Sequence, residues 1–242
     1  MLIALHNLLA QRFLQKWRNR DSPCESTFCS LEDRLALLLQ QLHNWDLDAL
    51  LLSEFSFNEF GSLFPQDKWE ILSNTSSQHD IGQAVLLRKD RWNDIYMENS
   101  FRKGVNGFIG VHANYSDCGK RVGICSIHAK YGDSSTTIED NVASSIDRTI
   151  PWIIGGDFNK SNPVMPDLFS LSLPTTHLSN TIHGTAFVTF DHIFLSKQLV
   201  PNSHLVHITP PAELLCHGYC LKKHQLLFSS DHAFIVVKLE IK

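Results

Sequence analysis

The 242-residue sequence lacks the features of a membrane-spanning chain and of a disulfide-stapled secreted domain. It has no run of about 18 apolar residues, so no segment is expected to cross a membrane as a helix. Its six cysteines include no C-x-x-C pair, and reduced thiols in an intracellular protein are the simpler expectation. Cys216 and Cys220 lie near His217 and His224, but their spacing is not that of a zinc finger, so we do not expect zinc.

The sequence also lacks an excess of positive charge. It has 21 Lys and Arg against 25 Asp and Glu, for a net charge of −4, so no global basic field draws in nucleic acid. A polyanionic substrate would therefore need a local basic groove or metal ions. At the amino terminus the basic residues follow the apolar stretch, which is the wrong order for a secretory signal. A mitochondrial presequence stays open, because no acidic residue precedes Asp21.

The length favours one large domain over residues 1–242, with a hydrophobic fraction of 43% that suits a globular chain. Apolar residues at helical spacing predict a helix over 31–45, and a second helix is expected over 140–148. Residues 160–186 and 201–228 are expected to be long loops. Strands are expected at 2–7, 49–54, 81–89, 107–115, 121–131, 152–159, 187–196 and 230–241.

Several of these strands share one feature: the apolar run ends in a side chain that can bind a metal or transfer a proton. The ends of strands can converge on one rim of a sheet, where ligands often bind. Hard carboxylate and amide oxygens suit Mg²⁺ or Mn²⁺, and a histidine beside a carboxylate suits a general base. The residues with this placement are Asn7, Glu54, His128, Asp157, Asn159, Asp191, Asp231 and His232.

The segment WIIGGDFN, residues 152–159, is the richest of these strand ends. Because side chains alternate along a strand, Asp157 and Asn159 are expected on one side and Phe158 on the other, in the core. Gly155 and Gly156 are expected to leave room for the backbone of a substrate.

The ordered series from Asn7 to the closing Ser-Asp-His resembles the endonuclease/exonuclease/phosphatase superfamily, which has the deoxyribonuclease I-like fold. The motifs that carry the resemblance are GDFN, DHIFLS, SDH and the strand GQAVLLRK, and they span almost the whole chain. The stretches HNLLAQRF and LLLSEF resemble the deadenylase branch. The resemblance implies an α/β (α+β) protein: a four-layer sandwich of two packed mixed sheets flanked by helices. It also implies cleavage of phosphoester bonds that depends on Mg²⁺ or Mn²⁺.

The resemblance implies a role for each residue of the series. Glu54 would hold the metal, helped by Asn7 and Asp231. Asp157 and Asn159 would position the attacking water and the scissile phosphate. His232 would act as general base or as a phosphate contact, with Asp191 setting its tautomer, and His128 would hydrogen-bond a phosphate oxygen. Several family members place an acid just before the strand at 81–89 to support that histidine; Asp80 and Gln83 both remain candidates for this place.

A nuclease acting on DNA or RNA is the leading hypothesis, with nucleic acid as the partner and a monomeric chain. Lys130 and Tyr131 follow His128 and are candidate substrate contacts. The competing hypotheses are a lipid or small-molecule phosphodiesterase or phosphatase on the same fold, such as a sphingomyelinase-like enzyme, and a noncatalytic binding module. The last is disfavoured because every expected polar position is filled.

Overall fold

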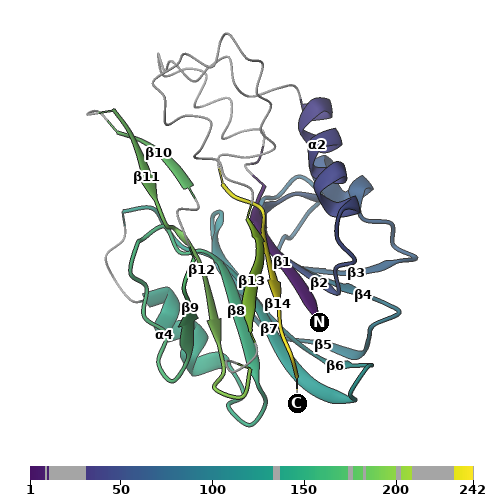
Figure 1. Ribbon diagram of the computed structural model, residues 1–242. Coiled ribbons are helices and arrows are strands. Elements are labelled where there is room, and N and C mark those ends of the chain that lie inside the picture. The colour runs from purple at the N-terminus through teal and green to yellow at the C-terminus, as the bar shows by residue number, and fades with distance from the viewer. Residues whose placement is uncertain are drawn as a thin grey trace.

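The computed structural model describes residues 1–8, 10, 31–132, 137–173, 177–181, 184–199, 203–208 and 232–241. Two six-stranded mixed sheets pack face to face, as Figure 1 shows. The first sheet has the strand order β13 (His204–Ile208), β14 (Ile235–Lys238), β1 (Leu2–Asn7), β2 (Ala49–Phe55), β4 (Gly82–Arg88) and β3 (Trp69–Ser73). The second has the order β5 (Trp92–Lys103), β6 (Asn106–Tyr115), β7 (Lys120–His128), β8 (Trp152–Asp157), β12 (Asp191–Leu195) and β9 (Phe169–Leu171).

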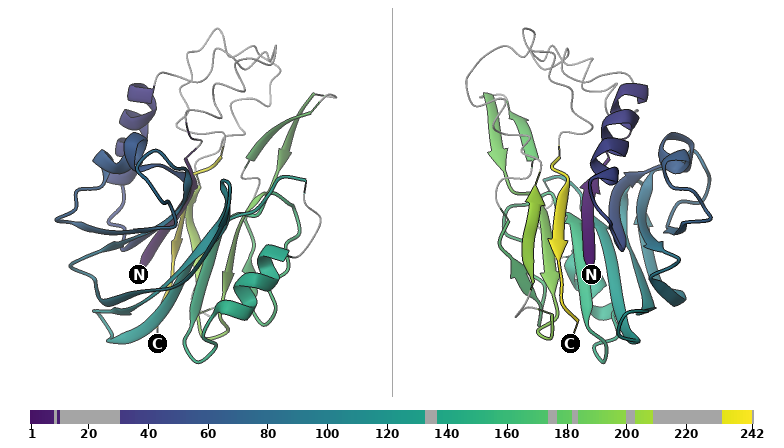
Figure 2. Two further views of the ribbon diagram at one scale, coloured as in Figure 1. Left: turned by 180° about the vertical axis from the view of Figure 1, so that it is seen from behind. Right: turned by 45° about the vertical axis from the view of Figure 1, so that its right-hand side comes forward.

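Helices lie on the two outer faces of this pair of sheets (Figures 1 and 2). Helix α2 (Leu31–His43) buries Leu38 against the first sheet, and α4 (Thr137–Ser145) buries Val142 against the second. The short helices α3 (Phe57–Phe60) and η1 (Gly61–Leu63) follow β2, and β10 (His177–Thr181) pairs with β11 (Gly184–Val188) as a separate hairpin. The predicted four-layer sandwich is therefore confirmed.

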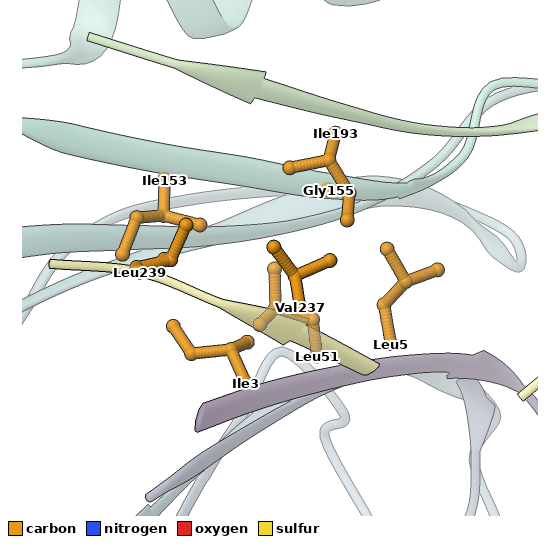
Figure 3. Close-up of a pocket in the computed structure, with 8 residues that line it drawn as sticks. All are labelled: Ile3, Leu5, Leu51, Ile153, Gly155, Ile193, Val237 and Leu239. Carbon is orange, nitrogen blue, oxygen red and sulfur yellow. The ribbon is translucent and has the colours of Figure 1, made fainter. Parts of the chain in front are cut away.

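The main hydrophobic core fills the space between the sheets. Figure 3 shows side chains of the first sheet facing those of β8 and β12 across this space. They enclose an apolar hollow of about 10 Å³, barely the size of one water and without the polar partners that a buried water needs, so we expect it to be dry. Its lining residues are Ile3, Leu5, Leu51, Ile153, Gly155, Ile193, Val237 and Leu239.

The structure differs from the expected elements in four places. The strand expected over 187–196 is two strands, because β11 ends at Val188 and β12 begins at Asp191. The second helix, α4, spans Thr137–Ser145, three residues earlier than expected. The segment 160–186 carries β9 and β10 rather than loop alone. Strand β5 was missed, because an exposed edge strand with only Trp92 buried has no alternation of apolar and polar residues to reveal it.

Two further strands, β3 and β13, are short and were also missed, and β13 lies within the segment 201–228 that was expected to be a loop. In the part of the chain that the structure describes, no helix is long and apolar enough to cross a membrane.

Candidate active site

The topology brings strand ends from both sheets to one edge of the sandwich. Strands β1 and β2 are parallel, and so are β7 and β8, so the carboxyl ends of each pair lie together. Asn7 is opposite Ser53 in the first sheet, and His128 is opposite Asp157 in the second. Strand β12 runs antiparallel to β8, so its first residue, Asp191, also lies opposite Asp157. His232 precedes β14, which runs antiparallel to β1 and starts at the same edge.

Asn7 joins the two sheets at this edge. Its side-chain Nδ2 donates to Asp157 Oδ2 at 3.0 Å and to Glu54 Oε1 at 3.3 Å, and it lies 3.4 Å from His232 Nε2. All four side chains are buried. The amide nitrogen, rather than the amide oxygen expected for a metal ligand, therefore faces the carboxylates in this structure.

Glu54 lies at an irregular point of β2. The register between β2 and β4 shifts between Leu52 and Phe55, and Glu54 has a φ of +55°. For a residue with a β-carbon this left-handed conformation costs about 1–3 kcal/mol, and it persists where surrounding contacts impose it. Here Oε2 accepts a hydrogen bond from the backbone N–H of Ala10 at 3.0 Å, and Oε1 lies 3.7 Å from His128 Nε2. The distortion aims the carboxylate at the second sheet.

His232 and Asp191 form a buried pair. His232 Nδ1 lies 2.8 Å from Asp191 Oδ2, and both side chains are buried. A carboxylate accepts hydrogen bonds, so Nδ1 carries the proton and Nε2 of the neutral ring keeps its lone pair. That Nε2 lies 3.5 Å from Asp157 Oδ2. The arrangement places a proton acceptor beside a carboxylate that can hold a water molecule.

The segment after β8 turns back on itself. Asn159 has a φ of +51°, which asparagine tolerates better than most residues. Its N–H donates to Asp157 Oδ1 at 2.8 Å, and its Nδ2 donates to Asp157 Oδ2 at 3.1 Å and to the Ala129 carbonyl at 2.9 Å. Asn159 thus meets Asp157 through a turn and not through strand alternation, while Phe158 lies in the core as expected.

The interpretation of the two glycines was wrong. A β-carbon on Gly156 would lie 2.1 Å from the Ile127 carbonyl oxygen, and its φ is +142°. A β-carbon on Gly155 would lie 3.3 Å from Leu5 and from Leu51 of the first sheet. Both glycines therefore permit close packing of strand on strand and sheet on sheet, and neither leaves room for a substrate.

His128 is oriented by a backbone carbonyl. Its Nδ1 lies 3.1 Å from the Val105 oxygen, which can only accept, so Nδ1 carries the proton and Nε2 faces Glu54 and Asp157. Gln83, which is fully buried, donates to the same carbonyl at 2.7 Å and accepts from Asn74 at 2.6 Å. Gln83 therefore acts on the imidazole only through the carbonyl between them.

Asp80 has a different set of contacts. Its carboxylate accepts a hydrogen bond from the backbone N–H of Ser76 at 3.0 Å and lies 3.1 Å from Arg102. The hydrogen bond from the Ser76 hydroxyl, then that from the Ser76 backbone N–H, and after these the charge of Arg102 lower the pKa of this carboxyl group. Of the two candidates, Gln83 and not Asp80 is the residue linked to His128.

Seven of the eight predicted site residues therefore come together, and Asp231 lies outside the described residues. The Asn74 amide and the Val105 carbonyl were missed, because a backbone oxygen and an isolated asparagine carry no sequence signal. Among the described residues, no group of three or more His, Cys, Asp or Glu is arranged to hold a metal ion by itself. Cys125 is buried and Cys118 exposed, and burial raises the pKa of the Cys125 thiol.

No family model and no curated protein matches the sequence. Solved structures do match along nearly the whole chain. D. rerio TDP2 complexed with a single-strand DNA product is 14% identical, with 98% of each chain covered and a TM-score of 0.67. ANGEL2, a 2',3'-cyclic phosphatase in complex with adenosine-2',3'-vanadate, is 14% identical, with 99% of this chain and 96% of that chain covered and a TM-score of 0.67.

A mannosyl-6-phosphatase of Bacteroides thetaiotaomicron is 16% identical, with 100% of each chain covered and a TM-score of 0.65. At these identities the likeness shows a common fold and leaves the substrate open. The fold expected from the sequence resemblance is confirmed: the chain has the deoxyribonuclease I-like fold, which these structures share.

Proposed function

We propose that this chain, as a single domain over residues 1–242, is a metal-dependent phosphodiesterase, and specifically a nuclease that hydrolyses DNA or RNA. The observation that carries the proposal is the meeting of two half-sites across the sheet interface. Asn7 and Glu54 come from the first sheet, and His128 and Asp157 come from the second, with 3.0 Å between Asn7 Nδ2 and Asp157 Oδ2. A structural role alone does not call for so many buried polar groups in one place.

The side chains present suit Mg²⁺ or Mn²⁺. Mg²⁺ is usually bound through one or two carboxylates, with substrate phosphates and water completing its shell, so it does not need a cage of protein ligands. Glu54 offers a carboxylate aimed into the cluster, and we propose that Glu54, Asn7 and Asp231 hold the metal. For Asn7 this requires the amide to turn its oxygen inward. When bound, the ion supplies positive charge that stabilises the phosphate oxygens and the leaving oxygen.

Each of the other residues in the cluster has its own role in the proposed hydrolysis. Asp157 and Asn159 hold the attacking water and the phosphate in line. The water oxygen attacks phosphorus and gives its proton to Nε2 of His232, whose Nδ1–H stays hydrogen-bonded to Asp191. The bond to the leaving oxygen breaks as the new bond to water forms. Because Nδ1 of His128 is committed to Val105, its Nε2 donates to a phosphate oxygen when the ring is protonated.

An exposed aromatic side chain favours nucleic acid as the substrate. The ring of Tyr131, three residues after His128, is 63% exposed and packs edge-on against Phe190 at 5.9 Å between ring centroids. Phe190 directly precedes Asp191 of the cluster. Nucleobases stack on such rings, and an exposed basic residue, Lys130, stands beside it for the phosphate backbone. D. rerio TDP2, with the same fold, was solved with a single-strand DNA product.

The second candidate is a small-molecule phosphatase or phosphodiesterase. It is favoured by the full-length match to a mannosyl-6-phosphatase, whose substrate carries no base. The same cluster would serve either reaction, because both require attack on an anionic phosphorus. A lipid phosphodiesterase would use the cluster in the same way, whereas a noncatalytic binding module would hold the phosphate without cleaving it.

The test is an assay of the purified chain on labelled single-stranded DNA and RNA, mannose 6-phosphate and sphingomyelin vesicles, with Mg²⁺, Mn²⁺ or a chelator. We expect hydrolysis of DNA or RNA with either metal, none with chelator, and at least a hundredfold loss in Asp157→Ala and His232→Ala. The matched control is His112→Ala, since His112 packs against Tyr96 on the outer face of the second sheet. Equal activity in wild type and both site variants would overturn the mechanism. Binding of oligonucleotide without hydrolysis of anything would favour the noncatalytic role.

A further inference from the structure

Two buried serines connect the sheets directly beneath the candidate active site. The Ser53 hydroxyl on β2 donates to the Ile127 carbonyl on β7 at 2.8 Å. The Ser126 hydroxyl on β7 donates to the Leu52 carbonyl on β2 at 2.9 Å. Both serines are fully buried. The two hydrogen bonds are reciprocal and run from one sheet to the other, and much of the remaining interface between the sheets is a cluster of buried apolar side chains.

The position of this pair in the chain gives it a consequence for the cluster. Ser53 directly precedes Glu54, and Ser126 and Ile127 directly precede His128. Face-to-face sheets normally lie about 10 Å apart, with interdigitating side chains between them. A hydroxyl on a short side chain reaches a carbonyl of the opposite sheet only where the backbones approach closely. The two bonds therefore hold the separation and the register of the sheets one or two residues before Glu54 and His128.

On the side of β4, the sheet ladder gives the backbone at Glu54 no regular support. The β2–β4 ladder is interrupted between Leu52 and Phe55, and Glu54 itself has the left-handed φ of +55°. Ladder hydrogen bonds from β4 thus do not position this carboxylate. Across the interface, His128 Nε2 lies 3.7 Å from Glu54 Oε1, a distance that a slide of the sheets would change directly.

We propose that Ser53 and Ser126 form an inter-sheet clamp that positions Glu54 against His128, so that they are positioning residues for the reaction proposed above. Sequence patterns do not reveal the clamp, because a serine before a glutamate and a serine within an apolar strand are each common. The simpler explanation is that both hydroxyls merely satisfy their own hydrogen-bonding needs. The two interpretations differ in what a loss of the hydroxyl does to catalysis when the loss of stability is matched.

The chain offers a matched control. The Ser196 hydroxyl is also buried and accepts from the Trp152 N–H at 2.8 Å, at the opposite end of β8 from Asp157. We expect Ser53→Ala, Ser126→Ala and Ser196→Ala each to lower the Tm by about 2–4 °C, as the loss of one hydrogen bond would. Only the two clamp variants should lower kcat, by about tenfold to a hundredfold at little-changed KM, because catalysis is sensitive to small displacements.

Values of kcat in both clamp variants within twofold of that of Ser196→Ala would overturn the clamp. If an alanine variant does not fold, the cysteine variant at the same position, whose thiol is a weaker donor, is judged by the same criterion.

A second readout separates the clamp from the proposed function, on which it rests. The imidazole ¹H–¹⁵N signals of His128 report its surroundings in the substrate-free protein. We expect them to shift in Ser53→Ala and Ser126→Ala and to stay at the wild-type positions in Ser196→Ala. A wild-type protein that is inactive on every substrate would refute the proposed function. The comparison of His128 signals would still test the clamp, because unchanged signals in Ser53→Ala and Ser126→Ala would refute it.

Discussion

The substitution Asp191→Asn tests the proposed roles of His232 as base and of Asp191 as the group that sets its tautomer, with little change in side-chain shape. Asp191 Oδ2 lies 2.8 Å from His232 Nδ1, and both groups are buried, so the carboxylate determines which ring nitrogen carries the proton. An asparagine that turns its amide N–H₂ toward Nδ1 would force the proton onto Nε2. The nitrogen that lies 3.5 Å from Asp157 Oδ2 would then be a donor and could no longer accept a proton from water.

The structure allows the size of the effect to be worked out. General-base catalysis contributes about 10²- to 10⁴-fold, and a wrong tautomer removes most of it, so kcat should fall by that factor while KM changes little. Replacing a charge-assisted buried hydrogen bond should also destabilise the fold by about 1.5–3 kcal/mol. Activity is therefore measured at a temperature at which circular dichroism shows the variant folded.

The control for this experiment is Asp48→Asn. Asp48 is also buried and accepts a hydrogen bond from the Leu2 N–H at 2.6 Å, but it precedes β2 at the end away from Glu54. It should lose stability and keep kcat. If Asp191→Asn is folded and its kcat stays within threefold of wild type, His232 does not depend on Asp191 for its tautomer, and the assignment of His232 as base fails.

Four further outcomes are expected. Saturating Mg²⁺ at a hundred times its Kd should stabilise the wild type by about 2.7 kcal/mol, and Glu54→Gln should abolish most of this gain in a thermal unfolding assay. Burial lowers the pKa of His192 below 6.5, so the wild type should lose stability as pH falls through 6.5, and His192→Gln should lose less in denaturant titrations at pH 7.5 and 5.0. Gly156→Ala should cost about 3 kcal/mol or more, because its β-carbon would meet a carbonyl at 2.1 Å, whereas Gly119→Ala, with φ of +66° and open space, should cost about 1–2 kcal/mol; similar losses would refute the steric argument. Tyr131→Ala should raise KM about tenfold for an oligonucleotide and leave a substrate without a base unaffected, and equal effects on both would argue against stacking.

The part of the site that the sequence predicted is the part that strand order controls. Asn7, Glu54, His128 and Asp157 each end an apolar run, and parallel pairing of β1 with β2 and of β7 with β8 places those ends together. An apolar run that stops at a polar residue is visible in the sequence. The run is apolar because the strand is buried, and it stops where the chain meets solvent or a ligand. The convergence then follows from topology, which the family resemblance supplied.

The remainder depends on contacts that no local pattern encodes. Gln83 supports His128 through the Val105 carbonyl, a route that requires the β5–β6 hairpin to lie over β4. Gly156 lets the backbone of Ile127 pack close to β8, and this can be recognised only once the pairing of β8 with β7 is known. Residue type alone could suggest that these positions matter, but their partners come from other strands far along the chain.

The exposed surface around the cluster must decide which substrate is chosen. The proposed attack on phosphorus needs only an anionic phosphoester at the cluster, and solved proteins of this fold include one with a DNA product and one named for mannosyl-6-phosphate. The left-handed backbone at Glu54 and Asn159 shapes the cluster from within the sandwich, as would the proposed clamp of Ser53 and Ser126, so a change of substrate need not disturb it. Selectivity is then a property of the exposed side chains around the cluster. Among the described residues, the ring of Tyr131 packs edge-on against Phe190, and Phe190 is the residue before Asp191. Tyr131 thus connects the exposed surface to the buried pair of Asp191 and His232. Binding of a base there and cleavage at His232 would be linked through a single short stretch of chain, so an effect of Tyr131→Ala on kcat as well as KM would indicate that the bound base also helps to align the phosphate.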